Sequence, residues 1–483
     1  MTALVGLIGE KRVLAQFKND QGDLVGKPFD LPLTIDERSL LLLCNAVLKN
    51  EEDTPYEFFV QDVNVKGTLD ETLAKLKDVV TEKVLEITYQ PQALFRVHPV
   101  TRCSSSIPGH TEAVIAVRFS PDGRCLASGS GDTTVRFWDI STETPLHTCE
   151  AHKHWILSIS WSPDGKKLAS GCKNGRVCVW DPSTGKQIGH TLIGHKQWIT
   201  WLSWQPLHDN PECTLLASAS KDGTVNIWDV RLGRRVLSLC GHTHCVTCVR
   251  WGGEGLIYTS SQDRTIRVWR ASDGVLCRTL QGHAHWVNTL ALSTDYILRT
   301  GAFEPADGAM RYSGVDCLSV DELKKRALNR YAAAKGSQPE RLVSGSDDFT
   351  LFLWEPEKSK NSIARMTGHQ QLINDVSFSP DTRYIASASF DKSVKLWDGR
   401  TGKYLASLRG HVSAVYQIAW SADSRLLCSG SSDSTLKVWE IKTRKLMMDL
   451  PGHADEVFTV DWSPDGEKVA SGGRDRVMKL WRR

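Results

Sequence analysis

Eight of the 17 tryptophans in this chain stand in one recurring frame. These tryptophans are Trp138, Trp180, Trp228, Trp269, Trp354, Trp397, Trp439 and Trp481. Six residues before each lies an aspartate, replaced once by Asn174, and ten residues before each lies a serine or threonine. A histidine that follows Gly or Ala precedes each frame, and the first complete set is His110, Ser128, Asp132 and Trp138. A frame that recurs eight times requires a fold built from repeated units.

The spacing of the repeats identifies their type. Successive frame histidines are mostly 41–47 residues apart, and an acidic residue follows six of the eight tryptophans. This period and motif are similar to those of WD40 repeats. Short β-branched or aromatic runs alternate with turns, as at 113–119, 125–128 and 134–138, so each repeat reads as several antiparallel strands. The chain is therefore predicted to be mainly β, with an eight-bladed WD40 β-propeller over residues 93–483.

The polar residues of the frame have a structural interpretation and a catalytic one. A buried indole N–H needs an acceptor, and the serine, histidine and aspartate can supply a connected chain of hydrogen bonds. The same three residue types also form hydrolase triads. Eight identical active sites in one ring are implausible, so we interpret the set as structural and predict no enzymatic activity.

Other chemical motifs are few. We find no nucleophile elbow, phosphate-binding loop or metal-ligand cluster apart from the repeats, and we expect no cofactor belonging to the chain itself. The pair Cys245 and Cys248 is the one CxxC. It lies in a predicted strand, where positions i and i+3 point to opposite faces, so we expect core residues and not a zinc or redox site.

The last repeat lacks a strand that the start of the propeller region can supply. The last repeat stops at Trp481, two residues before the end of the sequence, which leaves no outermost strand. Residues 93–104 are apolar enough to supply that strand and close the ring.

In the fifth repeat, 71 residues separate His283 from Trp354, against 28 in most repeats, so an insertion at about 294–340 is predicted. Its part 321–335 is basic and helix-forming; a tolerated surface loop and a partner-binding arm both remain open.

Residues 1–92 do not share the repeat. Strands are expected at 11–17, 24–33, 57–65 and 83–89, with a helix continuing through 40–48. This order resembles a small α+β ubiquitin-like (β-grasp) domain. Residues 1–90 carry 16 acidic and 10 basic side chains, so the head is acidic while the rest of the chain is basic.

Composition excludes two classes of protein. Hydrophobic residues make up 41% of the chain, the mean hydropathy is −0.28, and no stretch approaches the ~18 apolar residues of a membrane span. The 13 cysteines are scattered through apolar runs, and Met1–Glu10 lacks the pattern of a secretory signal. We therefore expect neither membrane insertion nor a secreted disulfide scaffold.

Taken together, the head, the ring and the insertion resemble the Notchless family of ribosome assembly factors. The most specific stretches are Tyr89–Arg96 (YQPQALFR), Gly129–Trp138 (GSGDTTVRFW) and Ser344–Trp354 (SGSDDFTLFLW). The resemblance implies a factor of the nucleus and nucleolus that acts on precursors of the large (60S) ribosomal subunit. It implies that the propeller docks on the particle while midasin, a dynein-related AAA ATPase, grips the ubiquitin-like head, so that ATP hydrolysis drives remodelling and factor release. The alternative is a WD40 scaffold that modulates Notch signalling by binding the receptor tail.

The resemblance also implies one metal-bridging residue. The metal-ion-dependent adhesion site of midasin holds Mg²⁺ with an open coordination position, which a partner carboxylate completes. The matching residue looks like Glu82, directly before the strand 84–88. The competing candidates are Asp78 and Glu86, and a plain solvated loop carboxylate is the alternative.

Contact residues on the propeller are expected at the position three after each repeat histidine, where the innermost strand begins. It is a tryptophan in three repeats, namely Trp155, Trp198 and Trp286. Exposed tryptophans are favoured binding anchors and can stack on unpaired RNA bases; packing beneath an adjacent loop is the alternative. Lysines expected near the same rim, which could steer the ring towards rRNA phosphates, are Lys153, Lys196 and Lys221.

Overall fold

The computed structural model describes residues 12–19, 24–48, 56–61, 63–65, 67–74, 84–91, 97–304 and 319–483. The chain divides into two compact units. The smaller, here the N-terminal unit, comprises Met1–Arg96 with Gly336–Gln338, and the larger, here the propeller unit, comprises Val97–Lys335 with Pro339–Arg483. None of the helices in the described ranges is long and apolar enough to cross a membrane.

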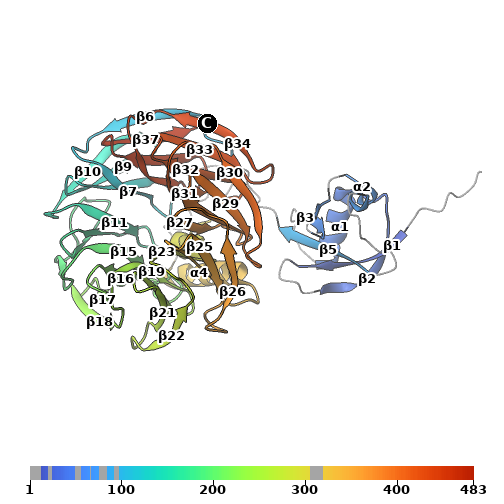
Figure 1. The fold of residues 1–483 in the computed structure, drawn as a ribbon, viewed down its shortest axis with the longest axis horizontal. Helices are drawn as coiled ribbons and strands as arrows, with labels where there is room; N and C mark the ends of the chain where they lie inside the picture. Colours follow the sequence, from blue (N-terminus) through green and yellow to red (C-terminus); the bar gives the residue numbers. More distant parts are fainter. Residues whose placement is uncertain are drawn as a thin grey trace, which may run out of the picture. The chain divides into compact units, whose positions relative to one another are not determined.

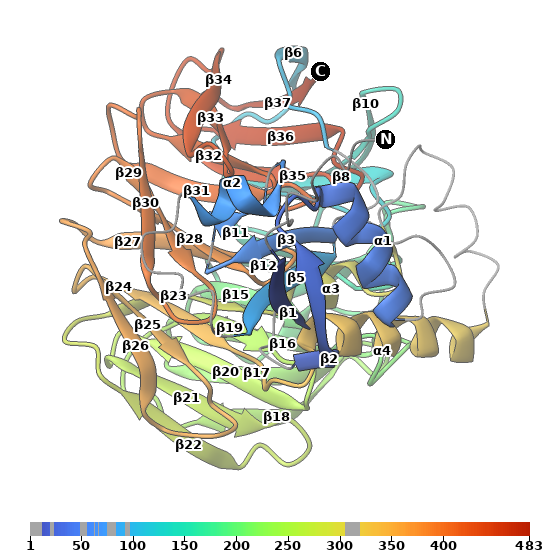
Figure 2. The ribbon, with the colours of Figure 1, turned by 90° about the vertical axis from the view of Figure 1, so that its right-hand side faces the viewer.

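The N-terminal unit is a five-stranded sheet with two helices. The strands are β1 (Arg12–Lys18), β2 (Leu24–Pro32), β3 (Tyr56–Val60), β4 (Val63–Asn64) and β5 (Leu85–Pro91), and the helices are α1 (Glu37–Leu48) and α2 (Leu69–Leu73). The strand order is β2-β1-β5-β3-β4, with β1 and β5 parallel. Helix α1 lies beside the sheet of this unit (Figure 2). Alternate residues of β1, such as Phe17, belong to the same buried core as Leu40 of α1. The single strand expected at 57–65 is two strands, because the chain turns back between β3 and β4.

The propeller unit contains eight four-stranded antiparallel sheets within the described residues, and we number them one to eight along the chain. Sheets one to four comprise β7 (Val114–Phe119), β8 (Cys125–Ser130), β9 (Thr134–Asp139), β10 (Thr144–Glu150); β11 (Ile156–Trp161), β12 (Leu168–Cys172), β13 (Arg176–Trp180), β14 (Leu192–Ile193); β15 (Ile199–Trp204), β16 (Leu215–Ser220), β17 (Thr224–Asp229), β18 (Arg234–Cys240); β19 (Val246–Trp251), β20 (Leu256–Ser261), β21 (Thr265–Arg270), β22 (Leu276–Gln281). Sheets five to eight comprise β23 (Val287–Leu292), β24 (Leu342–Ser346), β25 (Thr350–Trp354), β26 (Ser362–Thr367); β27 (Ile373–Phe378), β28 (Tyr384–Ser389), β29 (Ser393–Asp398), β30 (Tyr404–Arg409); β31 (Val415–Trp420), β32 (Leu426–Ser431), β33 (Thr435–Glu440), β34 (Lys445–Pro451); β35 (Val457–Trp462), β36 (Lys468–Gly473), β37 (Val477–Arg482), β6 (Arg102–Pro108).

These sheets form a ring, because the first strand of each sheet contacts the first strand of the next and β35 contacts β7 (Figure 1). The predicted fold class, a mainly β WD40 propeller after a small α+β domain, is confirmed. Glycine makes the packing between sheets tight. A Cβ at Gly171 of β12 would lie 2.4 Å from Ile199 Cγ2 of the next sheet, so a side chain there would separate the two sheets.

The N-terminal end of the propeller unit closes the ring. Strand β6 pairs antiparallel with β37, with Ile107 opposite Met478 and Cys103 opposite Trp481, and lies beside it in Figure 1. The strand therefore runs over Arg102–Pro108, later than the expected 93–104, of which residues 93–96 lie outside the described residues. The apolar residues behind that expectation have another place: Val97 and Val100 are buried, and Val97 N donates to Asp423 Oδ2 at 2.8 Å.

The described parts of the insertion are held against the ring. Helix α3 (Asp295–Thr300) follows β23, and its Arg299 makes two hydrogen bonds of 2.8 and 2.6 Å to Asp461 of β35. Helix α4 (Val320–Lys335) places Tyr331 in a stack on His208, with 4.7 Å between the ring centroids. Along these two helices the insertion is therefore part of the propeller unit.

Closure by β6 predicts a stability effect at Ile107, which is 7% exposed and packs with Met478 and Leu480. We expect Ile107→Ala to lower the free energy of unfolding by about 2–5 kcal/mol, because the strand loses its buried side chain. Urea denaturation followed by tryptophan fluorescence measures this effect in the propeller unit alone, since all 17 tryptophans lie in it. Ser106→Ala, on the exposed face of the same strand, is the control, and equal stability of the two variants would contradict closure by β6.

Candidate functional site

Four side chains of sheet one form a connected buried chain of hydrogen bonds. Trp138 Nε1 donates to Ser128 Oγ at 2.9 Å, and Ser128 Oγ lies 2.7 Å from His110 Nε2. Because the hydroxyl accepts from the indole, its own hydrogen is available to His110 Nε2. His110 Nδ1 then carries the other hydrogen and donates it to Asp132 Oδ2 at 2.8 Å.

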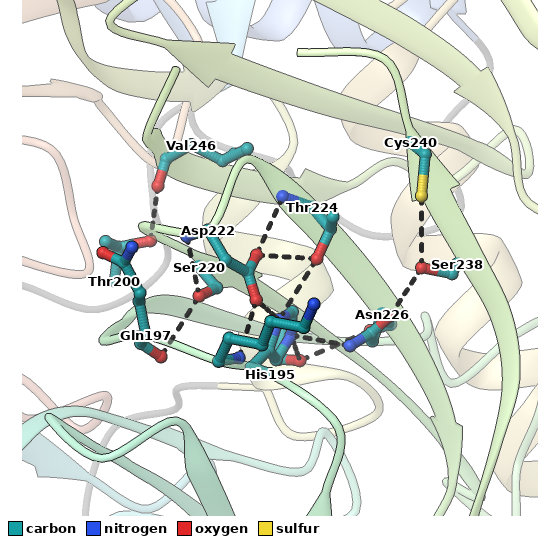
Figure 3. Close-up of polar contacts among 12 residues, drawn as sticks. His195, Gln197, Thr200, Ser220, Asp222, Thr224, Asn226, Ser238, Cys240 and Val246 are labelled. Atoms are coloured by element: carbon teal, nitrogen blue, oxygen red, sulfur yellow. Dashed lines mark hydrogen bonds and ion pairs between the residues drawn. The ribbon is translucent and has the colours of Figure 1, made fainter. Parts of the chain in front are cut away.

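The same contacts recur around the ring, and Figure 3 shows sheet three. His195 Nδ1 lies 3.0 Å from Asp222 Oδ2, and Thr224 donates to the other carboxylate oxygen of Asp222 from both its N–H and its hydroxyl. Burial alone would raise the pKa of Asp222, but the hydrogen bonds from His195 and Thr224 outweigh it and hold the pKa well below its ordinary value. The serine hydroxyls are fully buried and engaged on both sides, as at Ser218. This set is structural and presents no nucleophile to a substrate.

Sheet two departs from the frame. Its aspartate is replaced by Asn174, and His152 Nδ1 lies 3.9 Å from Cys178 Sγ. His152 Nε2 keeps its contact to Ser170 Oγ at 2.6 Å. Burial, together with the positive charge of Arg176, lowers the pKa of His152 to about 4. The imidazole of sheet two therefore stays neutral without a carboxylate partner.

The residues just after each repeat histidine, together with the turn that carries the frame aspartate, form one edge of the ring, here called the histidine rim. In sheet two the backbone N–H of Lys173, next to Asn174, donates to the carbonyl of Trp155 at 2.8 Å. In sheet three the N–H of Lys221 donates to the carbonyl of Trp198 at 2.9 Å. In sheets two and three these bonds place a tryptophan and a lysine side by side on the rim.

The predicted tryptophans are exposed, by 46% at Trp155, 40% at Trp198 and 43% at Trp286. The structure brings the first two together through Lys173, whose Nζ lies 4.7 Å from the Trp155 ring centroid and 4.6 Å from that of Trp198. Lys221 Nζ lies 4.4 Å from the same Trp198 centroid. Sequence reasoning missed Lys173, although it precedes the frame asparagine just as Lys221 precedes the frame aspartate.

The remaining rim candidates take no part in these lysine–tryptophan contacts. Lys153 and Lys196 are exposed and directly follow their repeat histidines. Trp286 borders an open depression of about 370 Å³ that is otherwise lined by sheet four, through Thr243, His244, Gln262, Asp263 and Arg264.

Cysteine chemistry is disfavoured at the CxxC. Burial raises the pKa of both Cys245 and Cys248 to about 11, so both thiols stay protonated at neutral pH. Cys248 is fully buried in β19. Cys245 lies just before β19 and is half-buried, so the expectation of a core strand residue holds for Cys248 but not for Cys245.

In the N-terminal unit, Glu82 and its competitor Asp78 lie outside the described residues. The other competitor, Glu86, is exposed on β5, and one of its carboxylate oxygens lies 2.7 Å from Lys18 Nζ. Its charge already has a partner within the sheet.

Comparison with known proteins covers both units. Residues 13–73 match the NLE (NUC135) domain, and residues 101–139, 143–181, 186–229, 233–270, 360–398, 402–440 and 444–482 match the WD domain, G-beta repeat. The chain is 59% identical over 371 residues to Protein Notchless of Drosophila melanogaster, covering 77% of this chain and 75% of that protein. It is 56% identical over 395 residues to the Notchless protein homolog of Arabidopsis thaliana, covering 82% of each chain.

A third relative is Ribosome assembly protein 4 of Saccharomyces cerevisiae, 47% identical over 407 residues, which cover 80% of this chain and 78% of that one. Among solved structures, the computationally designed Ika8 protein matches with a TM-score of 0.61 at 26% identity, over 79% of this chain and all of the designed chain. The repeat with the insertion lies between the matched WD ranges, yet its histidine keeps the frame contacts: His283 lies 2.8 Å from Ser344 Oγ and 2.9 Å from Asp348.

The low pKa of His152 predicts a pH effect. Below about pH 6.5 an unfolded chain binds a proton at this histidine, whereas the folded chain does not until about pH 4. The contribution of neutral His152 to the free energy of unfolding is therefore complete above pH 6.5. This contribution declines as the pH falls to 4, by roughly 3 kcal/mol in total. Asn174→Asp supplies a carboxylate for Nδ1, which raises the pKa of His152 and reduces this decline.

Nuclear magnetic resonance titration of the His152 ring gives the pKa, and urea denaturation at pH 7 and pH 5 gives the stability. Asn361→Asp, which adds the same charge in an exposed loop, is the control. If Asn174→Asp and its control show equal pH dependence, the missing carboxylate does not set the pKa of His152.

Proposed function

The chain belongs to the Notchless family of WD-repeat proteins, and from this premise we propose that it is a non-enzymatic assembly factor of the large ribosomal subunit that acts in the nucleus and nucleolus. The observation that carries the proposal is the 47% identity to a ribosome assembly protein over a span that includes most of both chains. Identity on this scale extends well beyond a shared repeat frame.

The geometry of the ring suits a docking scaffold. The frame residues are buried and engaged with one another, while the residues beside them on the histidine rim vary from sheet to sheet. We propose that Trp155, Trp198 and Trp286 contact the precursor particle. Lys153, Lys196 and Lys221 are exposed near them and favour a negatively charged partner such as rRNA.

The N-terminal unit is proposed to engage midasin. Its acidic balance and its separate compact fold support a role distinct from that of the basic ring. In this proposal Glu82 completes the coordination of a Mg²⁺ held by the adhesion site of midasin, because a hard cation with an open position favours a carboxylate oxygen. ATP hydrolysis in midasin would then pull on the head and drive remodelling of the particle and release of assembly factors.

Sedimentation tests the role in assembly. We expect the epitope-tagged chain in nuclear extracts to migrate with precursors of the large ribosomal subunit, since a docked scaffold moves with its particle. Detection of the precursor rRNA in the same gradient fractions identifies the particle. Recovery in light or membrane fractions alone would contradict the proposal and favour the alternative, a signalling scaffold on the Notch receptor.

Substitution at Glu82 tests the midasin contact. We expect the full chain to bind the isolated adhesion domain of midasin in Mg²⁺ and to lose binding with EDTA or with Glu82→Ala, because either change removes one side of the metal bridge. Glu86→Ala, which removes a carboxylate already paired with Lys18, should bind as the wild type does. If Glu82→Ala binds as tightly as the wild type, Glu82 is not the ligand and Asp78 becomes the next residue to test.

A further inference from the structure

Two lysines on the histidine rim are held against one indole. Lys173 Nζ and Lys221 Nζ lie 4.6 and 4.4 Å from the ring centroid of Trp198, and Lys173 Nζ also lies 4.7 Å from that of Trp155. Cation–π contacts of this kind are worth about 0.5–1 kcal/mol at exposed sites. The four side chains therefore form an alternating row across sheets two and three, here called the Trp-Lys row.

This row is specific to two sheets. Only in sheets two and three does the sequence place a lysine directly after the repeat histidine, a tryptophan two residues later and a lysine just before the frame residue. The lysines concerned are Lys153, Lys173, Lys196 and Lys221. The corresponding rim positions of sheets eight and one include acidic residues, among them Glu112, Asp455 and Glu456. The rim is thus positive on one arc, whereas on another arc Asp455 and Glu456 lie within 4 Å of Arg474.

The lysines of the positive arc form no ion pair in the part of the chain that the structure describes. Within the described ranges of the chain, none of these four lysines has a carboxylate oxygen within 4 Å. Two ammonium groups on one indole repel each other, so a ligand with several negative charges would stabilise the arrangement. Because the indoles already hold Lys173 and Lys221 in place, these side chains lose less conformational entropy when they bind such a ligand.

The depression beside Trp286 adds a second kind of contact. No lysine lies over the indole of Trp286 among the cation–π contacts of the described residues, and 43% of its surface is exposed. His244 and Arg264 line the same depression of about 370 Å³. An indole, an imidazole and a guanidinium are planar groups on which a nucleobase stacks. A flexible acidic peptide would satisfy the lysines but has no regular planar group for this depression.

We propose that the histidine rim of sheets two to five is a binding site for single-stranded RNA. The Trp-Lys row contacts the phosphates, and the depression beside Trp286 receives a base. This inference rests on the proposed function, because it names RNA as the partner class through which the ring docks. It adds Lys173, His244 and Arg264 to the residues expected from sequence.

The test measures binding of the purified full chain to a fluorescein-labelled oligouridylate by anisotropy at several KCl concentrations. Lys173→Gln/Lys221→Gln should weaken binding and reduce the slope of log K against log salt by about 1.4, which corresponds to two phosphate contacts on a single strand. Lys166→Gln/Lys186→Gln removes the same charge from turns at the opposite edge of sheet two and should leave both quantities unchanged. Lys173→Arg, which keeps the charge, should bind like the wild type.

The base contact is tested at Trp286. We expect Trp286→Ala to weaken binding by about 10-fold, in the range of a lost base stack, and Trp286→Phe to restore most of it. Tryptophan fluorescence and the thermal unfolding midpoint of each variant confirm that the ring is folded. Weaker binding by Trp286→Ala with no recovery in Trp286→Phe would argue against stacking and overturn the assignment of the depression.

Further outcomes separate this inference from the proposed function. Absence of RNA binding, or equal binding by the two double-lysine variants, overturns the RNA site, while co-sedimentation with ribosomal precursors would still support the assembly role. A polyglutamate peptide that competes as well as unlabelled oligouridylate would make an acidic protein segment the partner class and overturn the assignment to RNA. RNA binding through the Trp-Lys row without co-sedimentation would support the site and contradict the assembly role.

Discussion

The propeller unit depends on one hydroxyl per sheet that a tryptophan and a histidine share. In sheet one, Ser128 on β8 accepts from Trp138 on β9 and contacts His110 in the loop before β7. The hydroxyl thus connects two strands and a loop and is fully buried, where an unpaired polar group costs about 1–3 kcal/mol. Because the contact recurs, the loop that carries the histidine occupies the same position relative to the strands in each sheet. The residues that follow the histidine are therefore free to vary and to serve as the surface for partners.

Sheet two shows that one residue of the frame can change while the fold of the sheet is kept. Its histidine has lost the carboxylate partner, and burial with Arg176 keeps the imidazole neutral instead. The same turn carries Lys173, which reaches the tryptophans of two sheets. The one sheet without the frame aspartate is thus also one of the two sheets that form the positive arc. Such changes in single sheets make one side of a ring of nearly identical sheets different from the others, and this side can serve as a binding surface.

Two long-range contacts turn the repeats into one closed body. Strand β6 completes sheet eight from the other end of the propeller sequence, and the removal of two open edges stabilises the ring. Arg299 of the insertion reaches Asp461 in sheet eight, where that carboxylate also accepts from Phe119 N of sheet one at 2.8 Å. The insertion therefore contacts the place where the ring closes, which explains why α3 is tightly held although it lies in an interruption of sheet five.

The amino-acid sequence by itself determined the fold class and the frame contacts, because both follow from local residue patterns that repeat eight times. It also determined the position of the insertion, because one interval is much longer than the others. It also identified the rim tryptophans, since the position after each histidine has one fixed place in the repeat. The sequence placed the closing strand too early. Apolar residues such as Val97 have the composition of a buried strand, and only the structure shows that they are buried outside the strand. Only the tertiary structure decided that β6 begins at Arg102, that α3 binds Asp461 and that Lys173 lies between two indoles. Strand β6 pairs with a strand from the other end of the propeller sequence, α3 reaches sheet eight, and Lys173 lies between the indoles of two sheets. The distances between these residues therefore depend on how the ring closes.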